Sequence, residues 1–347
     1  MTRTSNRQMP RLQDVAELAG VSHQTVSRVV NSHPNVSKTT RQKVESAIMT
    51  LGYRRNTAAR SLVTRRSQTI GVLASELSQY GPAHTLLGLE QAARNAGYFV
   101  SIAALREVTK EGILNAVSHF TDQGVDGIVA LVPHLSTVDA LDEMNLSVPV
   151  VTVGSPGNSS ISGATVDQRQ GARLAVRHLL EQGHRRIAHV SGPPDWTDST
   201  ERAAGWRDAL LDAGVSDQIL LEGDWSAGSG YEIGLRIAAE RKISALFVGN
   251  DQMALGVLRA FAETNVRVPH DVSIVGFDDQ PESGYFTPPL TTVRQDFEEL
   301  GHRCVDVMLK KINTGTGATS TVVTPRMVLR ASTAPPPEHS PYLDRNT

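Results

Sequence analysis

Several features that would place the chain in a familiar class are missing from its sequence. It has a single cysteine, Cys304, among 347 residues, which excludes an internal disulfide and a cysteine-based zinc site. No apolar run has the length of a membrane span, and no apolar signal-peptide segment follows the N-terminus. We therefore predict a cytoplasmic protein with no membrane association, in which Cys304 is a buried small hydrophobic residue.

The motifs of nucleotide-binding and hydrolytic enzymes are missing too. No G-x-G-x-x-G or G-x-x-x-x-G-K-[ST] sequence opens a helix, and the GSG at 228–230 has no strand before it. No nucleophile-elbow pattern occurs, and the eleven histidines lack the spacing of metal ligands. His178 and His184, around one helix end, are expected to be satisfied surface groups. The sequence therefore predicts no catalytic residues, no metal site and no cofactor.

The small net charge of −2 conceals two parts of opposite sign. Residues 1–66 hold twelve Lys and Arg against three Asp and Glu, a net charge of +9. Residues 67–347 hold twenty-two basic against thirty-three acidic residues, a net charge of −11. Such a basic head on an acidic body favours binding of a polyanion through the head alone, because the body is repelled from phosphates.

The basic part contains a pattern typical of a helix-turn-helix. From Leu12 to Ala19, apolar residues recur at i, i+3, i+4 and i+7, which is one face of a short helix. A turn with Ser22 as a suitable N-cap follows, and then a segment with valines on one face and Gln, Ser, Arg and Asn on the other. These polar side chains suit the major groove, where Arg binds guanine and Gln or Asn binds adenine. The alternative for these two segments is an ordinary helical hairpin with a solvated polar face. A third helix is predicted from Ser37, as N-cap, to Gly52.

After residue 67, continuous apolar runs alternate with helical patterns in two successive series. This alternation predicts parallel sheets covered by helices, in two Rossmann-like lobes that face each other across a cleft. The predicted strands are 69–75, 98–105, 127–132, 148–153, 185–192, 244–249 and 272–277, and the predicted helices are 84–95, 111–123, 137–145, 168–181, 201–213, 231–240, 252–263 and 297–311.

Polar residues follow several of these strands, where ligands of α/β lobes bind. They are Ser75, the segment 195–202, Asn250 with Asp251, and Asp278 with Asp279. Sugars are bound by planar polar groups on hydroxyl pairs and by aromatic faces against C–H patches of the ring. Arg202, Asn250 and Asp278 could supply the polar groups, and Trp225 and Phe297 the aromatic faces. The alternative for the two aromatic residues is core packing.

Several stretches of the chain resemble the lactose-repressor family of bacterial transcription regulators, in that family's order and spacing over about the first 330 residues. They are DVAELAGVSHQTVSRVVN at 14–31, VSKTTRQKV at 36–44, the segment 56–62, EGDWSAGSG at 222–230, NDQMALG at 250–256, GFDD at 276–279 and PPLTTVRQDF at 288–297. Several are most similar to the member that gives the family its name. That member ends in a tetramerising leucine-heptad helix; the tail of this sequence shows no leucine heptad, and we therefore expect a dimer.

The resemblance implies an all-α helix-turn-helix DNA-binding domain followed by a two-lobe α/β effector domain like the periplasmic binding proteins. The implied divisions are a head at 1–55, a hinge helix and linker at 56–67, an effector-binding and dimerisation domain at 68–333, and a disordered Pro-rich tail at 334–347. Three crossings between lobes would give lobe 1 about 68–165 and 297–323, and lobe 2 about 166–294 and 325–333.

The resemblance also implies site residues. Those expected to bind DNA are Ser22, His23, Gln24, Thr25, Ser27, Arg28, Asn31, Asn56 and Leu62. Those expected to bind the effector are Arg202, Trp225, Asn250, Asp278 and Phe297, together with Gln295 at a crossover and Ser75 at a strand end. Leu62 would wedge between base pairs and bend the duplex; its alternative is packing in a linker helix. Asp251, Asp279 and Met253 are expected to be structural.

The chain departs from the family pattern at positions that bear on specificity. Gly154 replaces an aspartate, Asp198 replaces a serine, and Gln79 and Thr85 replace apolar residues of the cleft wall. The pocket is therefore more polar on that side, and we expect a sugar or glycoside as effector without naming it. His23 replaces a tyrosine in the recognition helix, so a related but different operator is expected.

Together these features predict a homodimeric, nucleoid-associated repressor that binds a pseudo-palindromic operator and responds to a sugar or glycoside in carbohydrate metabolism. A hinge that folds on DNA and melts when the effector binds would provide the allosteric coupling. Two alternatives stay open: a regulator that needs its ligand as corepressor, and a sugar-binding receptor with no role in gene regulation.

Overall fold

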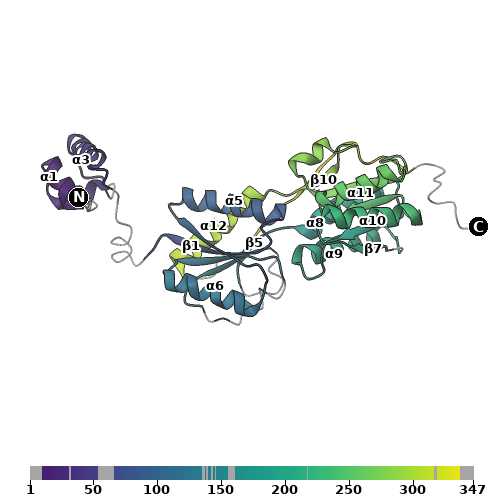
Figure 1. The fold of residues 1–347 in the computed structure, drawn as a ribbon, viewed down its shortest axis with the longest axis horizontal. Helices are drawn as coiled ribbons and strands as arrows, with labels where there is room; N and C mark the ends of the chain where they lie inside the picture. Colours follow the sequence, from purple (N-terminus) through teal and green to yellow (C-terminus); the bar gives the residue numbers. More distant parts are fainter. Residues whose placement is uncertain are drawn as a thin grey trace, which may run out of the picture. The chain divides into compact units, whose positions relative to one another are not determined.

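The computed structural model describes residues 10–30, 33–53, 66–134, 137, 140–141, 144, 146–154, 161–216, 218–315 and 319–336. The chain divides into two compact units, residues 1–67 and 68–347, and each is described by itself (Figure 1). None of the described helices is both long and apolar enough to cross a membrane.

Three short helices make up the first unit. They are α1 (Leu12–Ala19), α2 (His23–Val30) and α3 (Lys38–Leu51). Each contributes one fully buried valine to a small core, namely Val15, Val26 and Val44. The helix ends follow from the sequence: α1 ends at Gly20 with φ 64°, and the Ser37 hydroxyl accepts a hydrogen bond from the Thr40 amide at the start of α3.

The second unit contains two six-stranded sheets, which define its two lobes. The lobe 1 sheet has the order β11-β5-β4-β3-β1-β2 and is parallel throughout. The lobe 2 sheet has the order β12-β10-β9-β8-β6-β7 and is parallel except for β12, which pairs antiparallel with β10. The strands are β1 (Thr69–Ala74), β2 (Phe99–Ala104), β3 (Gly127–Leu131), β4 (Val150–Val153), β5 (Gly163–Val166), β6 (Ile187–Ser191), β7 (Leu220–Glu222), β8 (Ala245–Val248), β9 (Ser273–Asp278), β10 (Thr291–Arg294), β11 (Thr321–Val323) and β12 (Arg326–Val328).

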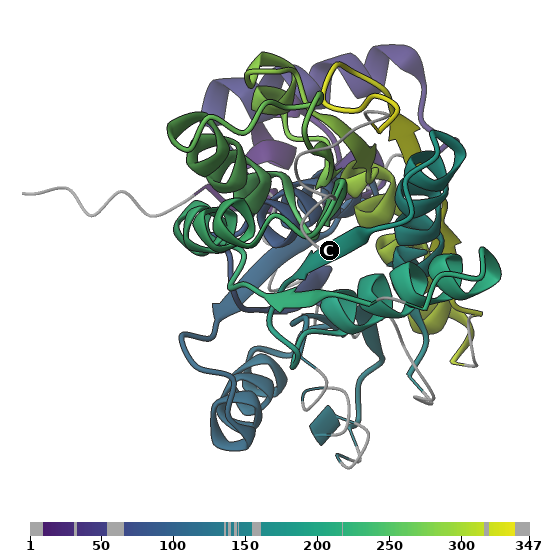
Figure 2. The same cartoon turned by 90° about the vertical axis from the view of Figure 1, so that its right-hand side faces the viewer.

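Helices cover both faces of each sheet, which explains why the central strands are apolar on both sides. In lobe 1, α5 and α12 pack on one face and α6 on the other. In lobe 2, α10 and α11 cover one face and α8 and α9 the opposite face (Figure 2). The helices are α5 (Tyr80–Asn95), α6 (Lys110–Gln123), α8 (Gln168–Glu181), α9 (Thr197–Asp212), α10 (Ala227–Glu240), α11 (Asp251–Glu263) and α12 (Phe297–Thr314), with a 3-10 turn η1 (Pro281–Tyr285).

The chain passes between the lobes three times. It leaves lobe 1 between β5 and α8, returns between β10 and α12, and leaves again between β11 and β12. The Asp167 amide donates to the Val323 carbonyl over 3.0 Å, so the first and third crossings are hydrogen-bonded to each other. The pocket between the lobes lies next to these connections.

The structure differs from the predicted elements mainly at helix starts. α5, α9 and α10 begin four residues before the predicted positions, because their first turns contain Gly, Pro, Ser and Thr rather than periodic apolar residues. The strands β5, β7, β10 and β11 were not among the predicted strands, and each has only three or four residues. The predicted helix 137–145 lies mostly outside the described residues.

His184 corrects a further prediction. It is buried, not a surface group, and its ring contacts the Ser244 hydroxyl at 2.9 Å, the Ser273 hydroxyl at 3.1 Å and the Ala334 carbonyl at 2.9 Å. Burial lowers the pKa of His184. Ala334, predicted to begin the tail, is therefore hydrogen-bonded to lobe 2. Cys304 is fully buried, as predicted.

The contact between α10 and α11 allows a direct test of this packing. A Cβ built on Gly256 would lie 1.9 Å from the Ala227 carbonyl oxygen, so Gly256→Ala must push two backbones apart. We expect a loss of about 1–3 kcal/mol in the free energy of unfolding, measured by urea denaturation. The matched control is Gly228→Ala in α10, where the nearest atom is 3.5 Å away. Equal stabilities of the two variants would contradict the close packing.

Candidate DNA-binding face and ligand pocket

The exposed side of α2 carries most of the predicted DNA-binding residues. Ser22, His23, Gln24 and Arg28 are exposed, whereas Val26 and Val29 of the same segment are buried in the core. Thr25 and Ser27 are partly exposed. The predicted residues of this helix therefore lie on the side away from the core. Asn31, Asn56 and Leu62, with most of the predicted hinge, lie outside the described residues.

Local hydrogen bonds leave two of these side chains available. The Ser22 hydroxyl accepts from the Thr25 amide over 3.2 Å and lies 2.9 Å from the Thr25 hydroxyl, so this pair fixes the start of α2. The side chains of Gln24 and Arg28 make no hydrogen bond to any described residue. They can therefore bind an external partner without breaking a hydrogen bond to a described residue.

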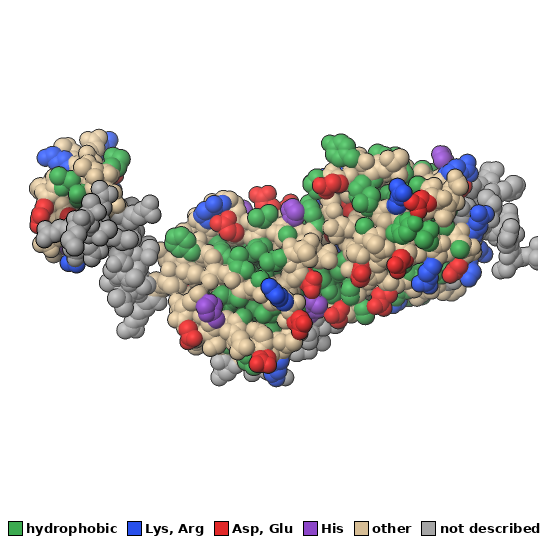
Figure 3. All heavy atoms as spheres, in the orientation of Figure 1, with side chains coloured by type: hydrophobic (Ala, Val, Ile, Leu, Met, Phe, Trp, Pro, Cys, Tyr) green, Lys and Arg blue, Asp and Glu red, His purple; other side chains and the backbone are tan. Residues whose placement is uncertain are grey.

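Acidic and basic side chains are interspersed on the face of the second unit drawn in Figure 3.

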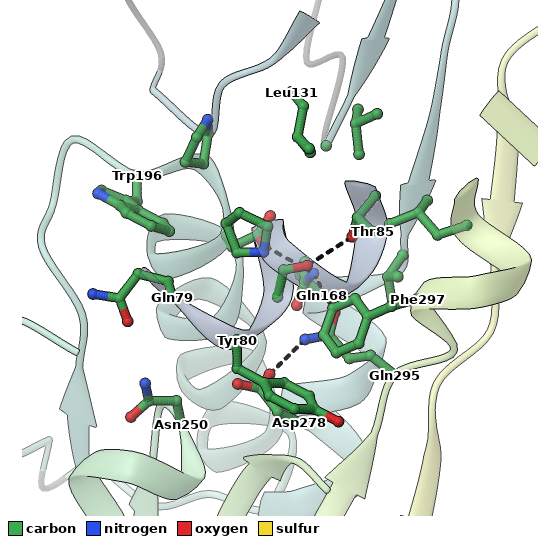
Figure 4. Close-up of a pocket in the computed structure, with 18 of the residues that line it drawn as sticks. Gln79, Tyr80, Thr85, Leu131, Gln168, Trp196, Asn250, Asp278, Gln295 and Phe297 are labelled. Atoms are coloured by element: carbon green, nitrogen blue, oxygen red, sulfur yellow. Dashed lines mark hydrogen bonds between the residues drawn. The ribbon is translucent and has the colours of Figure 1, made fainter. Parts of the chain in front are cut away.

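A pocket lies between the two lobes of the second unit (Figure 4). The space inside it is about 690 Å³ when the open solvent at its mouth is included. Its walls combine aromatic, amide, carboxylate and apolar side chains. The lining residues are Gln79, Tyr80, Gly81, Pro82, Thr85, Leu131, Pro133, Val153, Gly154, Val166, Gln168, Trp196, Asp198, Arg202, Trp225, Asn250, Asp278, Gln295, Phe297 and Leu300.

The lining contains six of the seven predicted effector-binding residues. These are Arg202, Trp225, Asn250, Asp278, Gln295 and Phe297. The seventh, Ser75, is not among the lining residues. It follows β1 but is only 2% exposed, and its amide donates to the Leu131 carbonyl over 3.2 Å. The hydroxyl of Ser75 is enclosed with no partner among the described residues.

Arg202 is the centre of a buried polar network in this pocket. Its Nε donates to the Gln168 Oε1 over 2.9 Å, and its Nη1 donates to the Gly249 carbonyl. Its Nη2 lies 3.6 Å from the Asp198 carboxylate and 3.8 Å from that of Asp278. The guanidinium also lies over the Phe277 ring, 4.0 Å from its centre. The positive charge of Arg202 is therefore shared between two carboxylates and an aromatic face.

Gln168 extends this network and was missed by the sequence analysis. Its Nε2 donates to the Gln295 Oε1 over 2.7 Å and to Asp198 over 3.1 Å, and Gln295 in turn donates to Asp278 over 2.6 Å. Gln168 is the first residue of α8, directly after a crossing. Only the position of that crossing could have pointed to it, because a glutamine at a helix start is otherwise unremarkable. Tyr80 was also missed, and Trp196 lies in the segment 195–202 named above but was not among the predicted effector-binding residues.

Trp225 is held in place by its neighbours. The Asn250 Nδ2 donates to the Trp225 carbonyl over 3.0 Å, while the Asn250 Oδ1 accepts from the Met253 amide and caps α11. A Cβ on Gly192 would lie 2.0 Å from the indole, so only glycine leaves room for this ring. The indole Nε1 is buried and has no acceptor among the described residues. A ligand oxygen could therefore accept a hydrogen bond there.

Burial changes the acidity of the pocket carboxyls. Desolvation raises the pKa of Asp278 to about 6, and the Arg202 charge and the Gln295 hydrogen bond oppose it. Desolvation also raises the pKa of Asp198, again opposed by Arg202. Behind the pocket, burial raises the pKa of Asp251 to about 7. Asp251 accepts from the Ser283 and Thr292 hydroxyls and the Gln280 amide, which joins loops of lobe 2.

The raised pKa of Asp278 predicts a pH dependence of stability. Between its ordinary value of 3.8 and about 6, folded Asp278 keeps a proton that the unfolded chain has released, so stability falls as pH rises through this window. Asp278→Asn removes this contribution, and its urea-denaturation midpoint should fall less than that of the wild type between pH 4 and 6.5. Asp122→Asn, an exposed change on α6, should follow the wild type. Parallel curves for wild type and Asp278→Asn would contradict the assignment.

Comparison with known proteins agrees with both units. Residues 11–56 match the family model of bacterial regulatory proteins, lacI family, and residues 176–333 match the periplasmic binding protein-like domain. The lactose operon repressor of Escherichia coli (strain K12) is 37% identical over 302 residues, 86% of this chain and 84% of that protein.

Two solved structures are also similar. The lac repressor dimer bound to operator and the anti-inducer ONPF has a TM-score of 0.84 at 34% identity, over 94% of this chain and 100% of that one. The complex of the transcriptional regulator CelR with cellobiose has a TM-score of 0.70 at 31% identity, over 93% and 99%. These matches confirm the predicted fold class: a helical head and two parallel-sheet lobes. The chain belongs to the LacI family of bacterial regulatory proteins, which are DNA-binding transcription regulators with a ligand-binding domain and not enzymes.

Proposed function

We propose that this protein is a dimeric repressor that binds a pseudo-palindromic operator through α2 and releases it when a neutral sugar or glycoside occupies the pocket. The head at residues 1–55 would bind the operator, the segment 56–67 would connect the units, and residues 68–333 would bind the effector and dimerise. The observation that carries the proposal is the pocket, which combines planar polar groups with aromatic faces between two lobes.

The charge of the pocket favours a neutral ligand. Arg202 is its one cation among the lining residues, and it already faces the carboxylates of Asp198 and Asp278. Binding of a phosphate or carboxylate group would require Arg202 to leave these partners or bring a third anion close to them. Hydroxyl groups can instead accept hydrogen bonds from the side-chain amides and donate hydrogen bonds to the amide and carboxylate oxygens, without any added charge. Neutral carbohydrates therefore fit the pocket better than sugar phosphates.

The pocket also offers a physical route to regulation. Its lining comes from both lobes, with Phe297 and Tyr80 from lobe 1 and Arg202 and Asn250 from lobe 2. A ligand that contacts both lobes favours one lobe arrangement by its differential affinity for the two states. The protein would act as a repressor released by its ligand if the heads of the dimer bind the operator more tightly in the lobe arrangement that the ligand disfavours. The similar lac repressor structure is a dimer bound to operator, which supports the same assembly here.

The DNA-binding half of the proposal predicts a loss of sequence preference in Arg28→Ala. Because Arg28 is exposed and has no partner among the described residues, it can bind a base edge, and its loss should cost about 1–3 kcal/mol on a selected operator. The measurement is fluorescence anisotropy with operator selected from random duplexes and with scrambled duplex. Lys43→Ala, an exposed change on α3, is the control and should keep the ratio of the two affinities. An equal loss on both duplexes in Arg28→Ala would mean a phosphate contact instead.

The effector-binding half of the proposal predicts that the operator affinity of Arg202→Ala no longer changes when ligand is added. The wild type is screened with neutral sugars and glycosides by thermal shift, and operator affinity is then measured with and without the best ligand. Arg202→Ala should bind operator like the wild type but lose the ligand's effect, because Arg202 organises the pocket and the head is a separate unit. Arg207→Ala, an exposed change on the same helix, should keep the response.

Two results would change the proposal. Full-strength ligand binding by Arg202→Ala in calorimetry would contradict the assigned pocket. A ligand that raises operator affinity in the wild type would make the protein a regulator with a corepressor.

A further inference from the structure

Trp196 forms one end of the pocket. It was not among the predicted effector-binding residues. It is the N-cap residue of α9, is 8% exposed and lines the pocket. Its ring packs on Trp225, with ring centres 5.4 Å apart, and meets His134 edge-on at 5.6 Å. The two indoles therefore form one continuous aromatic wall on lobe 2.

Contacts between the lobes fix this end of the pocket. The Thr197 amide and hydroxyl donate to the Pro133 carbonyl of lobe 1 over 2.9 and 3.2 Å. His134 Nδ1 lies 3.0 Å from the Asp195 carboxylate, and His134 forms a short antiparallel bridge with Trp196. The loop after β3 and the loop after β6 are thus joined directly beside Trp196. The ring of Trp196 is consequently positioned by both lobes rather than by lobe 2 alone.

The polar network lies at another part of the pocket. Figure 4 shows Trp196 and Gln79 on the opposite side of the view from Phe297 and Gln295. Gln79 precedes α5, and its side-chain amide makes no hydrogen bond to a described residue although it lines the pocket. The pocket is therefore lined by an aromatic face at Trp196 and by the Gln79 amide, whose hydrogen-bonding groups are not used by the Arg202 network.

We propose that Trp196 and Gln79 form a subsite for the second pyranose ring of a neutral disaccharide, with Trp196 as the specificity-determining residue. The inference rests on the proposed function, since it presupposes that a carbohydrate binds in this pocket. The first ring binds at the network of Arg202, Gln295 and Asp278 beside Phe297. The second ring lays its C–H face on the Trp196 indole, and its hydroxyls exchange hydrogen bonds with the Gln79 amide.

A purely structural role of Trp196 makes a different prediction. Trp196 belongs to the buried cluster of lobe 2, so its loss could loosen the whole pocket. In that case one-ring and two-ring ligands would weaken alike. A subsite instead changes the ratio between a disaccharide and its own monosaccharide, which packing alone does not.

The test is calorimetry on the full-length protein with matched sugars: glucose, cellobiose and maltose, galactose and lactose, and methyl and phenyl β-glucoside. In the wild type, we expect one disaccharide to bind roughly tenfold or more tighter than its monosaccharide. Trp196→Ala should bring this ratio close to one, and Trp196→Phe should leave an intermediate ratio. Gln79→Leu should weaken binding of the disaccharide but not of phenyl glucoside, because the phenyl ring that would take the place of the second sugar ring has no hydroxyls. Tyr285→Ala, a change at an 89% exposed residue, should keep the ratio.

The outcomes separate the two levels of the proposal. Sugar binding without any advantage for a disaccharide, or an unchanged ratio in Trp196→Ala, would overturn the subsite and leave the sugar-responsive repressor intact. Failure of every neutral sugar to bind the wild type would overturn both. If Trp196→Ala does not fold, Trp196→Phe and Gln79→Leu decide, since each keeps a side chain of similar bulk.

Discussion

The burial of one guanidinium group constrains the whole ligand pocket. A charge removed from water is tolerated only if it is paired and its hydrogen bonds are satisfied. For Arg202 this requires two carboxylates, the Gln168 amide, the Gly249 carbonyl and the Phe277 ring, which come from α8, α9, β9 and the end of β8. These requirements hold the strand ends and the starts of α8 and α9 in one arrangement. The shape of the pocket therefore depends on how this one side chain is paired.

The same network reaches the connections between the lobes. Gln168 and Gln295 stand at the first and second crossings, and they are hydrogen-bonded to each other over 2.7 Å. A ligand that rearranges this network thus acts where the lobes are joined, and a small local change can alter the lobe arrangement. In a regulator of this family, a pair of lobes with two arrangements is a two-state element that can couple ligand binding to DNA binding.

Much of the fold was predictable because its periodicities are strong. The buried parallel strands are continuous apolar runs, and the short helices of the head carry regular apolar faces. The starts of α5, α9 and α10 were missed because their first turns are formed by residues without apolar periodicity. The start of α9 is fixed by a tertiary contact of Thr197 with the Pro133 carbonyl, which no local pattern encodes. The start of α10 is capped by the Ser226 hydroxyl, which accepts from the Ser229 amide, and this local signal was not used in the prediction.

The candidate site was predictable where a strand end or a family motif pointed to it, as for Arg202, Asn250 and Asp278. Ser75 also follows a strand, yet it is buried and does not line the pocket. The strand-end rule predicts at which edge of the sheet a residue lies but not the direction of its side chain. Gln168 needed the structure, and so did the role of Trp196 within the indicated segment 195–202, since each depends on what the other segments place beside it. Neither residue type is distinctive at a helix start.

The central claim is that the glycoside and the operator bind preferentially to different states of one protein. Thermodynamic linkage between the two binding reactions makes that claim measurable. The affinity of a neutral glycoside is determined by calorimetry for the free protein and for the protein saturated with its operator. By reciprocity, operator must lower glycoside affinity by the same factor by which glycoside lowers operator affinity. The account predicts weaker glycoside binding in the operator complex, with the two factors equal. Equal glycoside affinity with and without operator would contradict it.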